Sequence, residues 1–178
     1  SRAASRPLRG SPRSIPGVRH RRRRTSRRRT GDRILAGSAE YGSNLVALLH
    51  QAKRQGIEIL WVPDDAAGQI GIKALENLID DRVKLICLTH IPSGGGLINP
   101  AAAVGKVAKA AGIPFLLDAC QALGQLPIDV DQISCDVICG TGRKFLRGPR
   151  GTGLLYVRKA LIEQLEPNQL NHHAAELL

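Results

Sequence analysis

The chain has 178 residues and a formal net charge of +11 at pH 7, but the positive charge is concentrated in its first thirty residues. These contain twelve Arg and no acidic residue, so residues 31–178 retain 14 of the 26 basic residues against all 15 acidic ones. A domain this close to neutral is not expected to bind nucleic acid or an anionic membrane through its overall field, and no apolar run is long enough to span a bilayer. We therefore expect a soluble, cytoplasmic protein with no membrane partner.

Residues 1–30 form an arginine-rich segment without a hydrophobic period. Clustered like charge and little apolar surface predict a disordered tail. A transit peptide would show an amphipathic pattern, which this segment lacks. One interpretation is an arm that binds nucleic acid by neutralising phosphates. The other, which we favour, is that the segment is not native coding sequence, because Arg, Ser, Pro, Gly and Ala are typical of a shifted reading frame in a GC-rich gene.

From residue 31 onward, short apolar runs alternate with segments of helical period. The glycines at 56 and 112 end two of these helices, and Pro100 begins one. Strands that are apolar on both faces and separated by helices indicate an α/β fold, with a mainly parallel sheet and helices on both faces. The expected strands are residues 33–37, 57–63, 83–89, 113–119 and 135–139, and the expected helices are residues 43–56, 71–80 and 100–112.

The last apolar run, residues 151–157, should pair differently. Only eleven residues, 140–150, separate it from the preceding strand, and they show no helical pattern. A parallel crossover needs a dozen or more residues and usually a helix. We therefore predict that this strand is antiparallel to its neighbour.

The four cysteines, at 87, 120, 135 and 139, lie in or beside expected strands. They show no paired CxxC spacing of the kind that binds zinc. We expect reduced core thiols rather than disulfides, and no metal site.

Polar side chains follow three of the expected strands, at the edge of the sheet where α/β proteins bind ligands. Each has a structural alternative. Asp118 and Gln121 resemble a capping box, His90 is typical of a buried structural histidine, and the arginines near Lys144 could be a solvated loop. The residues expected to gather at this edge are Asp118, Gln121, Thr89, His90, Thr141, Arg143 and Lys144.

An amine, a carboxylate and phosphate-binding groups are what pyridoxal 5′-phosphate (PLP) requires of a protein. A lysine holds the cofactor as a Schiff base, and a carboxylate keeps its pyridine nitrogen protonated. The run CDVICGTGRK, followed by six residues and then GTGLL, resembles the lysine signature of the class V aminotransferase family. These are fold type I PLP enzymes that include cysteine desulfurases, isopenicillin N epimerase-like proteins and carbon–sulfur lyases. The resemblance covers residues 31–165.

The resemblance implies a role for each matching residue. Lys144 would form the Schiff base and later move a proton at the substrate α-carbon, while Asp118 would pair with the pyridine nitrogen. Gln121 would lie beside the phenolic oxygen of the ring, and Tyr41 would substitute for the residue that stacks on the ring. The cofactor-binding residues implied are Gln121, Thr141, Arg143, His90 and Tyr41, with Thr141 and Arg143 at the phosphate.

The resemblance also implies how the chain is organised. Residues 31–165 would form part of the PLP-binding large domain and residues 166–178 a C-terminal tail, with the small domain missing, so that the chain is a fragment of a longer homodimeric enzyme. The substrate would be an amino acid. The sequence favours the aminotransferase, epimerase or lyase branch over a cysteine desulfurase, because no cysteine follows Cys139.

Overall fold

The computed structural model describes residues 30–165. The expectations for the two tails, including nucleic-acid binding by the N-terminal one, lie outside these residues except for Thr30. Contacts divide the chain into two units, and the unit Ser26–Glu163 contains every described helix and strand. Within residues 30–165, no helix combines the length and the apolar character needed to cross a membrane.

Six strands form one sheet in the order β2-β1-β3-β4-β5-β6. The first five are parallel, and β6 pairs antiparallel to β5, with Cys139 opposite Leu155. Both the mainly parallel α/β sheet and the antiparallel last strand are therefore confirmed. The strands are β1 (Arg33–Gly37), β2 (Glu58–Val62), β3 (Val83–Thr89), β4 (Phe115–Asp118), β5 (Val137–Thr141) and β6 (Gly153–Val157).

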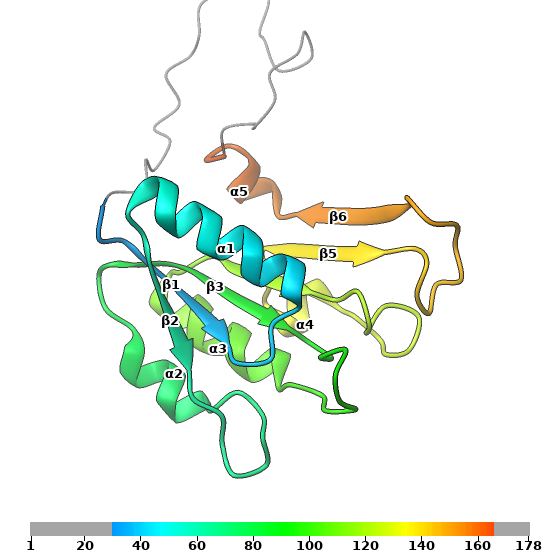
Figure 1. Cartoon of the computed structure of the whole chain (residues 1–178), viewed down its shortest axis with the longest axis horizontal. Helices are drawn as coiled ribbons and strands as arrows, with labels where there is room; N and C mark the ends of the chain where they lie inside the picture. Colours follow the sequence, from blue (N-terminus) through cyan, green and yellow to red (C-terminus); the bar gives the residue numbers. More distant parts are fainter. Residues whose placement is uncertain (1–29, 166–178) are drawn as a thin grey trace, which may run out of the picture. The chain divides into compact units, whose positions relative to one another are not determined.

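The helices cover the two faces unequally. Figure 1 shows α1 crossing one face of the sheet, with α2, α3 and α4 behind it. The glycines at 56 and 112 end α1 and α3 in the left-handed conformation, as expected from the sequence. The helices are α1 (Gly42–Gln55), α2 (Ile72–Leu78), α3 (Ala101–Ala111), α4 (Val130–Ile133) and α5 (Lys159–Ile162).

The main hydrophobic core lies between the sheet and the layer formed by α2, α3 and α4. Phe115 and Leu117 of β4 point into it and are fully buried, as is Val104 of α3. A smaller cluster lies on the side of α1, where Ile34 and Ala36 of β1 pack against the partly buried Leu48. Successive side chains along each strand thus pack alternately into one cluster or the other, which explains the continuous apolar runs in the sequence.

Several elements begin or end one or two residues away from their predicted bounds, and one helix was not predicted. The fifth strand begins at Val137 rather than residue 135, because Cys135 is buried in the turn that leaves α4 and its amide donates to the carbonyl of Val130. The short α4 was not predicted. It forms because the Asp129 carboxylate accepts hydrogen bonds from the amides of Asp131 and Gln132 at its start.

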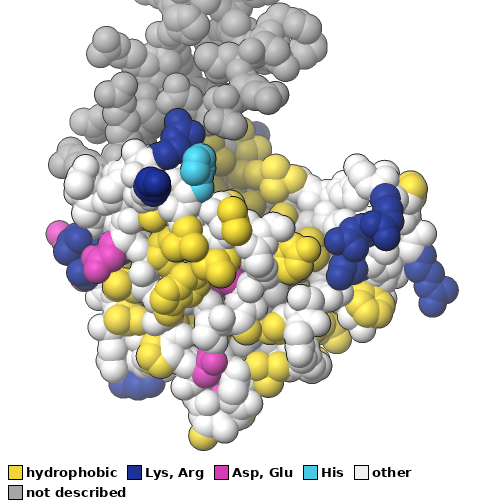
Figure 2. All heavy atoms as spheres, in the orientation of Figure 1, with side chains coloured by type: hydrophobic (Ala, Val, Ile, Leu, Met, Phe, Trp, Pro, Cys, Tyr) yellow, Lys and Arg dark blue, Asp and Glu magenta, His cyan; other side chains and the backbone are white. Residues whose placement is uncertain are grey.

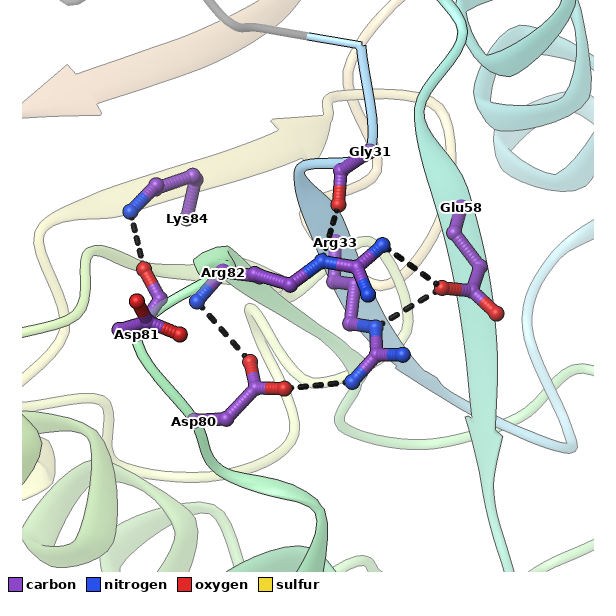
Figure 3. A network of polar contacts seen from close by, with 7 residues as sticks. All are labelled: Gly31, Arg33, Glu58, Asp80, Asp81, Arg82 and Lys84. Atoms are coloured by element: carbon purple, nitrogen blue, oxygen red, sulfur yellow. Dashed lines mark hydrogen bonds and ion pairs between the residues drawn. The ribbon is translucent and has the colours of Figure 1, made fainter.

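Charged residues tie together the amino-terminal ends of the first three strands (Figure 3). Arg33 of β1 donates to Glu58 of β2 at 2.8 Å and to Asp80 at 2.5 Å, and Arg82 donates to the carbonyl of Gly31 at 2.7 Å. The glutamate is largely exposed, so each of its ion pairs contributes little individually. This network lies at the end of the strands opposite to the polar residues discussed next.

Candidate functional site

Strand β4 carries Asp118 to the carboxyl-terminal edge of the sheet, between Thr89 of β3 and Cys139 of β5. The side chain is buried, with only 4% of the residue exposed. Its Oδ1 accepts the amide of Cys120 at 2.9 Å, and its Oδ2 accepts the side-chain amide of Asn44 at 2.7 Å. Within residues 30–165, Asp118 forms no ion pair.

The segment after β4 is a series of turns rather than a helix. The capping-box interpretation of Asp118 and Gln121 is therefore wrong. Gln121 is half-buried, and its carbonyl accepts the side-chain amide of Gln125 at 2.5 Å. Gly124 has φ +88°, and a Cβ there would lie 2.7 Å from the carbonyl carbon and oxygen of Phe145. This turn thus packs directly on the backbone that follows Lys144.

Strand β5 ends at Thr141, and a tight loop then carries Arg143 and Lys144. Gly142 donates to the carbonyl of Thr152 at 2.8 Å, and its own carbonyl accepts the amide of Gly148 at 2.7 Å. A Cβ on Gly142 would lie 2.3 Å from the hydroxyl oxygen of Thr152, so a larger residue there would displace the Thr152 side chain. Lys144 is half-buried and Arg143 is exposed.

The thiol of Cys120 lies within electrostatic range of both Asp118 and Lys144. Burial, followed by a hydrogen bond to the Asp118 carboxylate and the charge of that carboxylate, raises the pKa of Cys120 to about 11. A backbone hydrogen bond from Thr141 and the charge of Lys144 act in the opposite direction. The carboxylate at the end of β4 and the amine in the loop after β5 thus follow adjacent parallel strands, and both influence the pKa of this thiol.

His90 and Tyr41 are placed differently. His90 is buried, its Nδ1 donates to the carbonyl of Asn99 at 3.1 Å, and its backbone amide donates to the carbonyl of Asp118 at 3.0 Å. Burial lowers the pKa of this imidazole. Tyr41 is 43% exposed and immediately precedes α1. Asp118 and the loop bearing Lys144 follow adjacent strands, while the described contacts of His90 are structural.

Two residues that the sequence did not single out, Glu40 and Asn44, complete the polar edge. Glu40 accepts hydrogen bonds from both the backbone and the hydroxyl of Thr89, and Asn44 reaches Asp118. Burial raises the pKa of the Glu40 carboxyl, partly offset by the hydrogen bonds from Thr89. The only signal in the sequence is the spacing of Glu40 and Asn44 at i and i+4, which places them on one side of a helix start.

Comparison with known proteins settles the family. The model of the family described as aminotransferase class-V matches residues 8–176. The chain belongs to this family. Its members depend on PLP, as the sequence resemblance implied.

Several curated relatives of the chain are cysteine desulfurases. One, from Yersinia pestis (strain Pestoides F), is 38% identical over 137 residues, which cover 77% of this chain and 34% of the relative. The apo cysteine desulfurase of Thermococcus onnurineus NA1 superposes with a TM-score of 0.75 at 26% identity, over 84% of this chain and 39% of that one. The present chain thus spans about a third of the length of the curated relatives it matches.

One structural relative is a C-DES mutant with glycine covalently linked to its PLP cofactor. It superposes with a TM-score of 0.72 at 26% identity, over 79% of this chain and 38% of that one. The residues of the present chain fit such a cofactor. A buried carboxylate without a counter-charge is costly, and a protonated pyridine nitrogen would supply the positive charge that Asp118 lacks among the described residues.

Proposed function

We propose that this chain forms the cofactor-holding part of a PLP-dependent enzyme that acts on an amino acid, with Lys144 as the residue that forms a Schiff base with the cofactor aldehyde. The observation that supports the proposal is a buried carboxylate without an ion-pair partner among the described residues, Asp118, at the end of the strand next to β5, whose following loop presents Lys144. These are the two groups that the cofactor needs on opposite sides of its ring.

Each residue has a distinct task in this proposal. When bound, the cofactor supplies an electron-withdrawing ring conjugated to the substrate α-carbon. Asp118 holds the proton on the pyridine nitrogen, because its buried carboxylate stabilises the adjacent positive charge. The amine of Lys144 would accept and return the proton at the substrate α-carbon.

The remaining predicted residues would orient the cofactor. Thr141 and Arg143, at the end of β5 and in the following loop, would donate hydrogen bonds to the phosphate, which arginine binds well through its planar guanidinium. Gln121, in the turn that packs against this loop, would lie near the phenolic oxygen of the ring. Tyr41 would cover the ring, and His90 would support this edge through its bond to the Asp118 carbonyl.

Titration with pyridoxal 5′-phosphate tests the proposal directly. A protonated Schiff base should give an absorption band at about 420 nm. We expect Lys144→Ala to abolish the band, whereas Lys106→Ala, which removes an exposed lysine from α3, should leave it unchanged. A band of equal strength in Lys144→Ala would refute the role proposed for this residue.

Cysteine desulfuration is the specific reaction that the relatives favour, since the Yersinia relative is a cysteine desulfurase. The alternatives within the family are transamination, epimerisation and carbon–sulfur bond cleavage. The products formed from L-cysteine distinguish these reactions. Alanine and transferable sulfur indicate a desulfurase, whereas pyruvate and sulfide indicate a lyase.

A further inference from the structure

A polar network joins the start of α1 to the carboxyl-terminal edge of the sheet. The carboxylate of Glu40 accepts the backbone amide of Thr89 at 2.9 Å and its hydroxyl at 2.7 Å. The side-chain amide of Asn44 donates to Asp118 Oδ2 at 2.7 Å and also lies 3.5 Å from Glu40 Oε2. Thr89 and Asp118 are register partners on β3 and β4, so the network spans two adjacent strand ends.

This network matters because α1 has little else to hold it at the site. None of its fourteen residues is buried, and Leu48 is its partly buried contact with the smaller core cluster. Hydrogen bonds to ionised carboxylates are stronger than those between neutral groups, and more so away from water. Glu40 and Asn44 therefore fix the start of α1 to the sheet through hydrogen bonds.

The network also sets two features of the proposed site. Asn44 fixes the direction of Asp118 Oδ2, while the amide of Cys120 holds Oδ1, so the carboxylate plane is defined from both sides. Tyr41 lies between Glu40, which is bonded to β3, and Asn44, which is bonded to β4. Its carbonyl accepts the amide of Leu45 at 3.0 Å, which fixes its backbone as the start of α1.

We infer that Glu40 and Asn44 are positioning residues of the cofactor site. Asn44 orients the Asp118 carboxylate toward the pyridine nitrogen of the cofactor. Glu40 and Asn44 together hold Tyr41 beside the cofactor ring. The inference rests on the function proposed above. Neither residue is required to touch the cofactor. Both act through the residues that they hold.

The test compares cofactor binding by Asn44→Ala with binding by the unchanged protein. Loss of a hydrogen bond to a charged group should raise the Kd for pyridoxal 5′-phosphate about tenfold. It should also weaken the circular dichroism of the bound cofactor, because the ring is no longer held in one orientation. Asn77→Ala, which changes an exposed asparagine of α2, is the matched control and should alter neither quantity.

A second variant separates positioning from folding. Asn44→Asp keeps the size of the side chain but replaces the amide donor with a third carboxylate beside Asp118 and Glu40. Because this variant loses the donor without leaving a cavity, it should weaken cofactor binding as well. A lower unfolding midpoint with unchanged Kd and dichroism in either variant would overturn the inference while leaving the proposed function intact. No cofactor band in the unchanged protein would overturn both.

Discussion

Individual residues at the sheet edge show how burial sets the chemistry of this chain. Cys120 and Cys139 both neighbour Asp118, and burial, followed by the carboxylate charge, raises the pKa of Cys139 to about 12. Thiols so far from ionisation are poor nucleophiles. They should remain protonated beside the proposed cofactor and should not compete with Lys144 for its aldehyde.

Glu40 gives a pH-dependent prediction at the residue scale. Burial raises the pKa of this carboxyl above its usual 4.5. In the pH window between the unfolded and the folded pKa, the folded chain therefore binds more protons than the unfolded chain. The free energy of unfolding should therefore fall as the pH rises through the window and remain lower above it. Glu40→Gln keeps an acceptor for the Thr89 amide but cannot ionise, so this part of the decline should disappear.

Urea unfolding at several values between about pH 4 and pH 7 measures this difference. Glu163→Gln, at an exposed position after α5, is the control and should follow the unchanged protein. Parallel curves for the unchanged protein and Glu40→Gln would show that Glu40 titrates normally, contrary to the prediction.

The polar residues of the site could be predicted only in part. Asp118 and Lys144 stand out in the sequence, because they follow apolar strands and match a family signature. Glu40 and Asn44 do not, because their importance comes from meeting Thr89 and Asp118, which are more than forty residues away in the chain. His90 also shows the limit of sequence reasoning, since its bond to Asn99 depends on how the segment after β3 folds back.

Whole elements were easier to predict than their ends. The continuous apolar runs and the glycines at 56 and 112 define strands and helices because burial on both faces and helix termination leave local patterns. The four-residue α4 leaves no such pattern, and the start of β5 depends on the buried turn at Cys135.

The packing of α3 on α4 gives a prediction for these elements. A Cβ on Gly105 would lie 1.7 Å from the backbone carbonyl oxygen of Ile133. Gly105→Ala should therefore lower the free energy of unfolding by about 1–3 kcal/mol, because overpacking outweighs the better helix propensity of alanine. Chemical denaturation measures the change.

Gly94→Ala is the matched control, because a Cβ there would have no neighbour within 4 Å. Its effect should stay within about 0.5 kcal/mol. Equal stability of the two variants would mean that α3 and α4 are not in the close contact described here.

The face of the sheet that carries α1 exposes apolar side chains at the scale of the whole described unit. Hydrophobic side chains gather on the face that carries α1 (Figure 2). On the edge strand β6, Leu155 is 69% exposed opposite Cys139, and Val46 on α1 is 67% exposed. Exposed apolar surface of this kind marks contact regions in many proteins. Homodimer formation and cytoplasmic location stay predictions.

The α/β architecture was predictable because it follows from the order of apolar segments and from the short connection before β6. The unequal cover of the two faces was not, because it depends on how few side chains of α1 reach the sheet. The chain spans about a third of its curated relatives, so the reaction of the whole enzyme is proposed from them rather than from this unit.

The most direct test of the account asks which lysine binds the cofactor. The chain contains seven lysines. After incubation with pyridoxal 5′-phosphate, borohydride reduction and proteolysis, mass spectrometry should find the pyridoxyl group on Lys144, and this labelling should weaken in Asp118→Ala. Labelling spread evenly over the exposed lysines, with Lys144 unmodified, would contradict the central claim that Lys144 and Asp118 form one cofactor site.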